Sequence, residues 1–223
     1  MGMQLRRWNS LPDVMKTKEV RKYYNIIKRR QVSLKLKRVF DVVVASIMLI
    51  FLAIPMLVIA VCIKLDSRGP VFFRQERVTQ YGRIFKIYKF RTMVVDAPKL
   101  GASVTVDNDS RITRVGRVLR KIRADEFPQL FNILKGDMSL VGPRPERPFF
   151  VEKFREEIPR YMVKHQVRPG LTGWAQVNGY RGDTSIRKRI DCDLYYIENW
   201  SIGFDIKILF LTIFKGFINK NAY

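Results

Sequence analysis

The chain has 223 residues, which is long enough for one domain with a substantial core. Hydrophobic residues make up 47% of it, which excludes a chain that is disordered throughout. Lys and Arg number 42 against 20 Asp and Glu, and the formal net charge of +22 indicates an anionic partner: nucleic acid, anionic lipid or a phosphate-rich substrate. With only Cys62 and Cys192, the sequence predicts neither a disulfide framework nor a cysteine–histidine metal cluster.

Residues 16–38 form a basic and partly amphipathic run. The Tyr23-Tyr24 pair and the neighbouring pair of isoleucines suit a helix that lies on anionic lipid headgroups. A solvated helix with a basic face fits the same pattern, and the sequence leaves both interpretations open.

Residues 42–63 contain 22 uncharged positions, about 33 Å as a straight helix and enough to span a bilayer. A charged segment precedes them and no cleavage site follows, which argues against a secretory signal peptide. Both flanks are basic: residues 1–41 carry twelve Lys or Arg and three acids, and residues 64–91 carry eight and two. Because basic flanks stay cytoplasmic and Pro55 disrupts helical hydrogen bonding, we predict a helix that enters and leaves by the same face. One ordinary spanning helix is the alternative.

The next segments alternate between strand-like, loop-like and helical patterns. Residues 71–93 alternate in two runs around Tyr81-Gly82 and predict a short β-hairpin. Residues 96–110 are polar and predict a loop, in which Asp109 or Ser110 would cap a helix over about residues 112–123.

A second helix is expected from near Asp125 to just before Gly136, with Pro128 in its first turn. Loops are predicted at 141–148 and 167–179, with helical turns on both sides of Pro159 between them. Asp183 or Thr184 is expected to cap a helix that ends near residue 199. The last prediction is an interfacial or core helix over 201–220.

Asp125-Glu126 is the most unusual local feature, because six cations precede it within residues 111–123. In a continuous helix, Asp125, Gln129 and Asn132 would share one polar face, and Arg120 could converge on it. A carboxylate among guanidinium groups stays ionised at neutral pH and can attack phosphorus. The alternative is a structural role for both acids, as helix caps with salt bridges.

The two proline- and glycine-rich loops offer further phosphate ligands. Prolines restrict the backbone around Arg144, and glycines near Arg168 would allow a close backbone approach. The lone histidine, His165, is expected to be a packing or surface residue. Asp191 and Asp193 are expected on a solvated helix face.

These motifs together resemble the bacterial sugar transferase family, the monotopic phosphoglycosyl transferases. The resemblance is carried by KRVFD (37–41), the proline-interrupted apolar stretch, GPVFFRQERV (69–78), FKIYKFRTM (85–93), RADEFPQLFNILKGDMSLVGPRP (123–145), VRPGLTGWAQVNG (167–179) and DLYYIENWS (193–201). It covers about residues 35–222. The family's Ser-Pro pair in the membrane helix is Ile54-Pro55 in this chain.

The resemblance implies transfer of a hexose 1-phosphate from a UDP-sugar, such as UDP-glucose or UDP-galactose, to undecaprenyl phosphate, with release of UMP. It implies a ping-pong route in which Asp125 is the nucleophile and Glu126 supports it. Mg²⁺ would lie at Asp125, and Arg120, Arg144 and Arg168 would contact phosphate. The enzyme would begin capsule, exopolysaccharide or glycoconjugate assembly on the cytosolic face of the bacterial cytoplasmic membrane.

We therefore expect a mainly α-helical, single-domain α+β protein with a small β-hairpin, a proline-kinked re-entrant helix and amphipathic interfacial helices. The expected division is a basic extension (1–34), the membrane helix (35–66) and a cytosolic catalytic domain (67–223). Its partners would be the UDP-sugar, undecaprenyl phosphate, lipids of the cytoplasmic leaflet and a possible second copy in a homodimer, with no nucleic acid. The competing hypotheses are a membrane-tethered nucleic-acid-binding protein and a non-catalytic lipid-binding scaffold.

Overall fold

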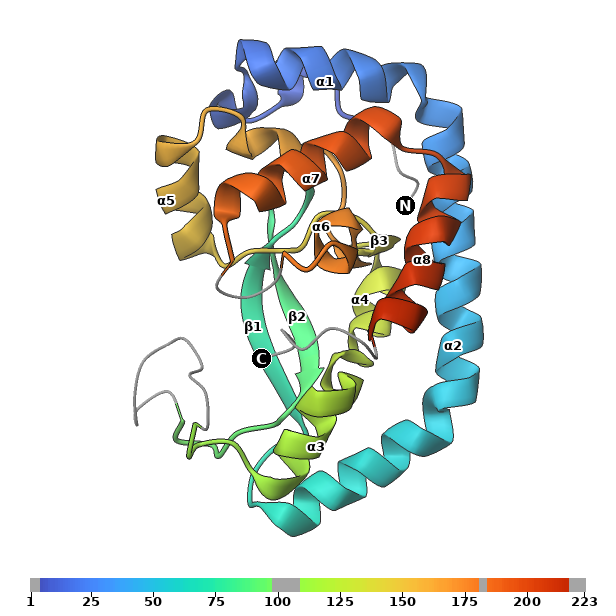
Figure 1. Ribbon diagram of the computed structural model, residues 1–223, viewed down its shortest axis with the longest axis vertical. Coiled ribbons are helices and arrows are strands. Elements are labelled where there is room, and N and C mark those ends of the chain that lie inside the picture. The colour runs from blue at the N-terminus through green and yellow to red at the C-terminus, as the bar shows by residue number, and fades with distance from the viewer. Residues whose placement is uncertain (1–4, 98–108, 181–183, 217–223) are drawn as a thin grey trace.

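The computed structural model describes residues 5–97, 109–180 and 184–216, which are mostly helical with two small sheets, as expected for the α+β class (Figure 1). The α-helices are α1 (Lys18–Arg29), α2 (Gln31–Asp66), α3 (Arg114–Ile122), α4 (Gln129–Lys135), α5 (Pro148–Glu157), α6 (Trp174–Val177), α7 (Ile186–Asn199) and α8 (Ile202–Gly216). The strands are β1 (Phe72–Val78), β2 (Ile84–Phe90), β3 (Ser139–Val141) and β4 (Gly170–Thr172). Short 3₁₀ turns are η1 (Trp8–Ser10), η2 (Asp13–Met15), η3 (Gln80–Gly82), η4 (Ala124–Glu126) and η5 (Tyr161–Gln166).

The predicted hairpin is confirmed. β1 and β2 pair antiparallel, with Phe72 opposite Phe90 and Val78 opposite Ile84. The turn needs left-handed backbone at Tyr81 (φ 62°) and Gly82 (φ 76°), and a glycine adopts that conformation without strain. β2 then runs alongside α4 and η4, so the hairpin forms one wall of the candidate site described below.

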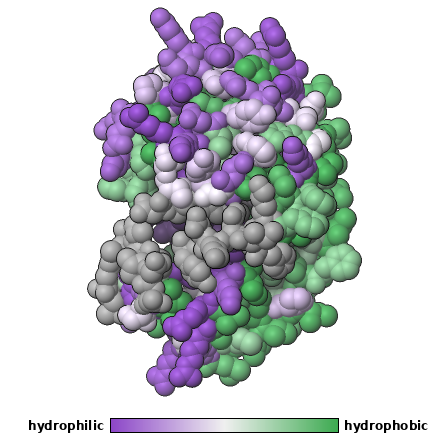
Figure 2. Space-filling view, viewed as in Figure 1, coloured by the Kyte–Doolittle hydropathy of each residue, from purple (hydrophilic) through white to green (hydrophobic). Residues whose placement is uncertain are grey.

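α2 is a single 36-residue helix with Pro55 inside it, and it is long and apolar enough to cross a membrane. Only 11% of its most apolar 18-residue window is buried. Large apolar side chains are exposed along much of its length: Val43, Ile47, Ile50, Phe51, Ile54, Leu57, Val58, Val61 and Leu65. In Figure 2 hydrophobic residues gather along the side where Figure 1 shows α2 and α8, whereas hydrophilic residues cover the end formed by α1. The kink at Pro55 and the re-entrant path stay predictions.

α1 packs into the main core, and the apolar side chains of its inner face do not point outward as a headgroup-binding helix would require. Tyr23, Tyr24 and Ile27 are at most 7% exposed, because α1 lies against η5 and α7. The Gln166 side chain donates a hydrogen bond of 3.0 Å to the Val20 carbonyl. The interpretation in which the Tyr23-Tyr24 pair lies on lipid headgroups is therefore wrong. A solvated basic face for α1 stays a prediction. The domain boundaries at 34 and 66 stay predictions.

The helices around the acidic pair begin and end differently from the prediction. Thr113 caps α3 through its hydroxyl, which accepts a bond of 3.0 Å from the Gly116 N–H. Asp109 is not the cap, because its carboxylate binds the backbone and guanidinium of Arg111 in its own loop. The expected loop is outside the described residues over 98–108.

The two glycine-rich loops meet each other through a parallel pairing of β3 with β4, which the sequence did not predict. The Gly142 N–H donates to the Thr172 carbonyl and the Gly170 N–H to the Pro143 carbonyl, both at 2.9 Å. A Cβ atom at Gly170 would lie 2.1 Å from the Gly142 nitrogen. These glycines therefore permit loop-on-loop packing, which fixes the loop that carries Arg144.

The C-terminal helices α7 and α8 close the core beside α6 and the β3–β4 pair. Ser185 caps α7 by accepting from the Lys188 N–H, in place of the predicted Thr184; Asp183 lies outside the described residues. The interior face of α8 includes the fully buried Ile208, while its outer apolar side chains are exposed. α8 is thus both a core helix and an apolar surface helix.

Asp193 is only 1% exposed and ion-pairs with the equally buried Lys164 at 3.3 Å. Its predicted place on a solvated face is wrong, because α7 turns that face toward η5. Asp191 is exposed as predicted, in an ion pair with Arg160. Cys62 and Cys192 are both free cysteines.

Candidate active site

Lys89, the penultimate residue of β2, joins the two acidic side chains that the sequence singled out. Its Nζ lies 2.7 Å from Glu126 Oε1 and 3.7 Å from Asp125 Oδ2. All three side chains are at most 20% exposed. Two carboxylates and an ammonium group therefore lie together in a partly buried environment, where charges interact more strongly than in water.

A tight turn, rather than a long helix, presents the two acids. α3 ends at Ile122, the capping residue Arg123 that follows has left-handed backbone (φ 59°), and Asp125 and Glu126 come next in η4. The expected shared helix face with Gln129 and Asn132 is wrong, because α4 begins only at Gln129. Asn132 is instead fully buried against the edge of β2, where its side chain binds the Tyr88 N–H and the Lys86 carbonyl at 2.9 Å.

The acids have different electrostatic surroundings. Burial raises the pKa of Asp125, and the nearby charge of Lys89 opposes that rise. Burial would also raise the pKa of Glu126, but the charges and hydrogen bonds of Lys89 and Arg144 outweigh it and lower the pKa to about 2. Two cations thus keep Glu126 ionised. Asp125 interacts more weakly with the Lys89 ammonium group, because the distance between them is 3.7 Å rather than 2.7 Å.

Arg144 completes the cationic side of the site. Its Nη2 lies 3.4 Å from Glu126 Oε1. Two residues along, Glu146 ion-pairs with Arg189 of α7 at 2.8 Å, and its carbonyl accepts a 2.9 Å bond from the Val78 N–H. The loop is therefore attached to both α7 and the hairpin, and it places Arg144 beside Glu126; its contact with phosphate stays a prediction.

Arg120 also lies near the acids. Burial lowers the pKa of its guanidinium, and Asp125 is the foremost charge that opposes this effect. Its Nε donates a 2.9 Å hydrogen bond to the hydroxyl of Thr92, just beyond β2. The structure thus brings together four of the five predicted site residues: Arg120, Asp125, Glu126 and Arg144.

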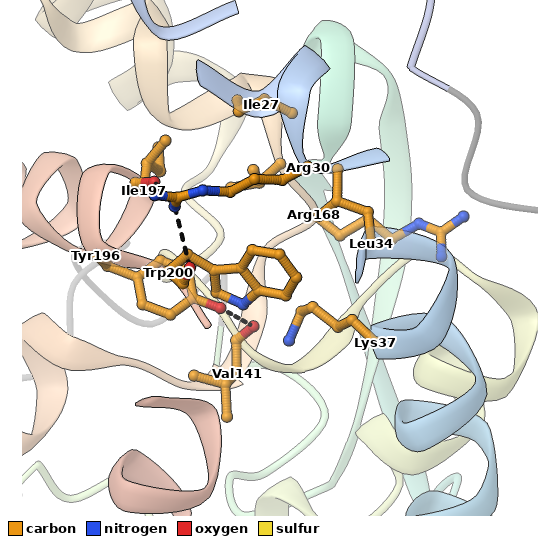
Figure 3. A pocket seen from close by; sticks show the side chains of 10 residues that line it. Ile27, Arg30, Leu34, Lys37, Val141, Arg168, Tyr196, Ile197 and Trp200 are labelled. Carbon is orange, nitrogen blue, oxygen red and sulfur yellow. Dashed lines mark hydrogen bonds between the residues drawn. The ribbon is translucent and has the colours of Figure 1, made fainter. Parts of the chain in front are cut away.

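Arg168 has a different set of neighbours. It lines a small cavity with Arg30 and Lys37, between the start of α2 and the end of α7 (Figure 3). Burial lowers its pKa, and the charged groups that follow in importance are Arg38 and Asp41 rather than the acidic pair. Its role as a phosphate ligand stays a prediction that the contacts among the described residues leave unsupported.

Lys89 is the site residue that sequence reasoning missed. Lys86 and Lys89 lie in β2 and Arg91 follows it directly, and nothing in the order of residues distinguishes one of these cations from the next. Strand alternation does offer a partial signal, because Lys89 and Ile87 must face the same side and Ile87 is buried. His165, by contrast, is the buried packing residue expected, at 4% exposure.

The carboxylates, lysine and arginines form a compact group suited to binding and attacking a phosphate. The chain matches the bacterial sugar transferase family over residues 32–219 and belongs to that family.

Curated relatives share close to half of the matched residues. The chain is 47% identical over 192 residues to a UDP-glucose:undecaprenyl-phosphate glucose-1-phosphate transferase of Escherichia coli (strain K12), covering 84% of this chain and 41% of the relative. It is 52% identical over 180 residues to a UDP-N-acetylgalactosamine-undecaprenyl-phosphate N-acetylgalactosaminephosphotransferase of Aeromonas hydrophila, covering 80% and 43%. It is also 45% identical over 188 residues to the exopolysaccharide production protein PSS of Rhizobium leguminosarum bv. phaseoli, covering 81% and 94%. The chain thus spans about two fifths of the first two relatives.

Proposed function

We propose that this protein transfers a sugar 1-phosphate from a UDP-sugar to undecaprenyl phosphate. The observation that carries the proposal is the pair of adjacent carboxylates with unequal partners, Glu126 fixed by two cations and Asp125 held only at 3.7 Å by Lys89. The names of the curated relatives, which include glucose and N-acetylgalactosamine phosphotransferases, support the general reaction.

In the proposed first half-reaction, a carboxylate oxygen of Asp125 attacks the phosphorus that bears the sugar. A new phosphorus–oxygen bond to Asp125 forms, and the bond from that phosphorus to the oxygen shared with UMP breaks. UMP leaves with the electron pair. In the second half-reaction, a phosphate oxygen of the lipid attacks the same phosphorus, and Asp125 leaves as a free carboxylate.

The neighbouring residues have complementary roles in this proposal. Arg144 and Arg120 bring positive charge to the diphosphate, where charge is redistributed in the transition state. Lys89 offsets part of the negative charge that two adjacent carboxylates place beside a phosphate. Glu126 holds Lys89 and Arg144 in place, so it acts on the reaction mainly through them.

The residues present fit a bound Mg²⁺. Among the described residues no cluster of three or more Asp, Glu, His or Cys side chains exists, so the protein would contribute one or two carboxylates and the substrate phosphates would supply further oxygens. Asp125 is the better candidate ligand, because Glu126 already binds Lys89 and Arg144. When bound, the ion would offset the negative charge of the diphosphate.

We further propose that α2 attaches the enzyme to the bacterial cytoplasmic membrane, with the site on the cytosolic face. The exposed apolar surface of α2 gives it a place among lipid chains, and the basic flanks favour the cytosolic side. At that interface a soluble UDP-sugar and a membrane-embedded lipid phosphate can reach the same carboxylate.

The test is an assay of the purified chain with radiolabelled UDP-sugars and undecaprenyl phosphate in detergent or nanodiscs. UDP-glucose, UDP-galactose and the N-acetyl sugars are tested in parallel, with and without a chelator. We expect a labelled lipid and UMP from at least one donor, loss of both in Asp125→Asn, and dependence on Mg²⁺. An active Asp125→Asn variant would refute the covalent role, and an inactive native chain with every donor would refute the reaction.

A further inference from the structure

Thr92 lies where the hairpin, α3 and the candidate site meet. It follows β2 by two positions and is 8% exposed. Its carbonyl accepts a 3.0 Å hydrogen bond from the Thr113 N–H at the start of α3. The next residue, Met93, forms an antiparallel bridge with Ile112. The backbone at Thr92 is therefore fixed to the helix that carries Arg120.

The first turn of α3 is pressed onto Thr92. A Cβ atom at Gly116 would lie 2.1 Å from the Thr92 carbonyl oxygen, so the helix approaches this strand end as closely as a glycine allows. The register between Thr92 and α3 is thus set by backbone contacts that do not depend on the threonine hydroxyl. Removing the Thr92 hydroxyl should therefore leave the packing of α3 unchanged.

Within the part of the chain that the structure describes, the Thr92 hydroxyl makes one hydrogen bond, which leads to the site. Thr92 Oγ1 accepts the hydrogen bond from Arg120 Nε at 2.9 Å. A long arginine side chain has several rotatable bonds, and a bond at Nε restricts the orientation of the planar guanidinium group. Asp125 is the foremost charge acting on that guanidinium.

We propose that Thr92 is a positioning residue that orients the Arg120 guanidinium toward the phosphate that Asp125 attacks. The inference rests on the proposed function, because it takes Arg120 as a phosphate ligand. It adds that the end of β2 and the residues that follow it both serve the site: Lys89 contacts the acids directly, and Thr92 acts through Arg120.

The test compares Thr92→Val, which replaces the hydroxyl with a methyl group of similar size, with Thr92→Ser, which keeps the hydroxyl. With the UDP-sugar that gives the fastest lipid product, we expect Thr92→Val to lower kcat about tenfold, the effect of losing one well-placed hydrogen bond to a charged group. The KM for the UDP-sugar and the thermal midpoint should change little. Thr92→Ser should remain within about threefold of the native kcat.

A matched control is Thr113→Val, which removes a neighbouring hydroxyl that caps α3. It should lower the thermal midpoint and leave kcat near the native value. A double-mutant cycle then tests whether Thr92 acts through Arg120. In the Arg120→Ala background, adding Thr92→Val should cause no further loss of kcat, because the group that it orients is already gone.

Three results would overturn the inference: a native kcat in Thr92→Val when Arg120→Ala is impaired, an equal loss from Thr92→Val with and without Arg120, or a loss that Thr92→Ser does not rescue. In each of these cases the native chain still makes lipid product, so the proposed function survives. A native chain that is inactive with every donor would overturn the proposed function, and this inference with it.

Discussion

At the scale of single residues, the adjacent carboxylates of Asp125 and Glu126 differ in their charged partners and therefore in the direction of their pKa shifts. Lys89 and Arg144 keep Glu126 ionised, with its pKa lowered to about 2. Burial raises the pKa of Asp125 instead, which makes its ionisation sensitive to every nearby charge. The proposed nucleophile, Asp125, is therefore the acid with fewer close cationic partners, whereas Glu126 contacts both Lys89 and Arg144.

Lys89 should set the pH range in which Asp125 is reactive. Removing its charge in Lys89→Met leaves burial less opposed, so the pKa of Asp125 should rise further. We expect the acidic limb of the kcat/KM profile to move upward by roughly one pH unit, with a lower maximum. Lys86→Met, on the exposed part of the same strand, is the control and should leave the limb in place. An unmoved limb in Lys89→Met would contradict the electrostatic role.

His165 should make the fold sensitive to acid. Burial, with the charge of Lys164, lowers its pKa from 6.5 to about 3, so the folded chain keeps it neutral where the unfolded chain binds a proton. Its contribution to stability is complete above pH 6.5 and decreases below it, by up to about 1.4 kcal/mol per pH unit until the folded pKa is reached. We expect the stability difference between native and His165→Gln chains, from urea unfolding, to shift against the native chain between pH 7.5 and 5. A difference independent of pH would contradict this account.

At the scale of elements, the N-terminal segment proves to be part of the fold although it precedes the residues matched to the family. α1 packs on η5 and α7, and Arg30 donates to the carbonyls of Glu198 and Trp200 at the end of α7, at 3.0 Å each. A cation at the C-terminal end of a helix satisfies carbonyls that lack partners within the helix. The segment thus covers a part of the domain that would otherwise expose apolar surface.

Truncating the buried face of α1 should accordingly destabilise the whole domain. Ile27 is 4% exposed, and Ile27→Ala should cost about 2–4 kcal/mol and lower the thermal midpoint by several degrees. Asn25→Ala changes an exposed position of the same helix and should have almost no effect. Equal midpoints for the two variants, measured by differential scanning fluorimetry, would show that α1 is not part of the cooperative unit.

The sequence predicts the secondary-structure elements better than the contacts between them. Periodicity identified the hairpin, α2 and α7, because each has a local pattern that its neighbours do not override. The break between α3 and α4 was missed because it depends on left-handed backbone at Arg123 and on Asn132 binding the edge of β2. Buried Asp193 was missed for a similar reason, since only tertiary structure supplies Lys164.

The grouping of the candidate site residues was predicted to a comparable extent, whereas their roles stay predictions. Motifs pointed to Asp125, Glu126, Arg120 and Arg144, and these do gather. No local pattern distinguishes Lys89 from other strand cations, and none places Arg168 beside Arg30 and Lys37. Roles that arise from contacts between distant segments require the structure.

At the scale of the whole molecule, polarity is divided between two regions. Apolar side chains are exposed along α2 and the outer side of α8, while exposed basic residues cover α1 (Figure 2). A buried network ties the two helices together: Lys37 of α2 binds Asp205 of α8 at 2.6 Å, and Tyr196 donates to the same carboxylate. A membrane position imposed on α2 would therefore be transmitted to α8 and to the adjoining β3 strand.

The re-entrant path of α2 can be tested by labelling its two ends. Val32 and Leu65 are each 82% exposed, so cysteines at these positions should react readily. In a background of Cys62→Ser and Cys192→Ser, we expect an impermeant maleimide to label both Val32→Cys and Leu65→Cys in inverted vesicles and neither in right-side-out cells. Labelling from opposite sides would establish a spanning helix.

The most direct test of the central claim is a search for the covalent intermediate on Asp125. The native chain is mixed with UDP-sugar and Mg²⁺ in the absence of lipid phosphate, then analysed by rapid quench and intact-protein mass spectrometry. We predict a burst of about one equivalent of UMP and a mass increase of one hexose or N-acetylhexosamine phosphate that maps to Asp125, with neither in Asp125→Asn. UMP release that requires the lipid phosphate, with no adduct in a chain that turns over normally, would contradict the account.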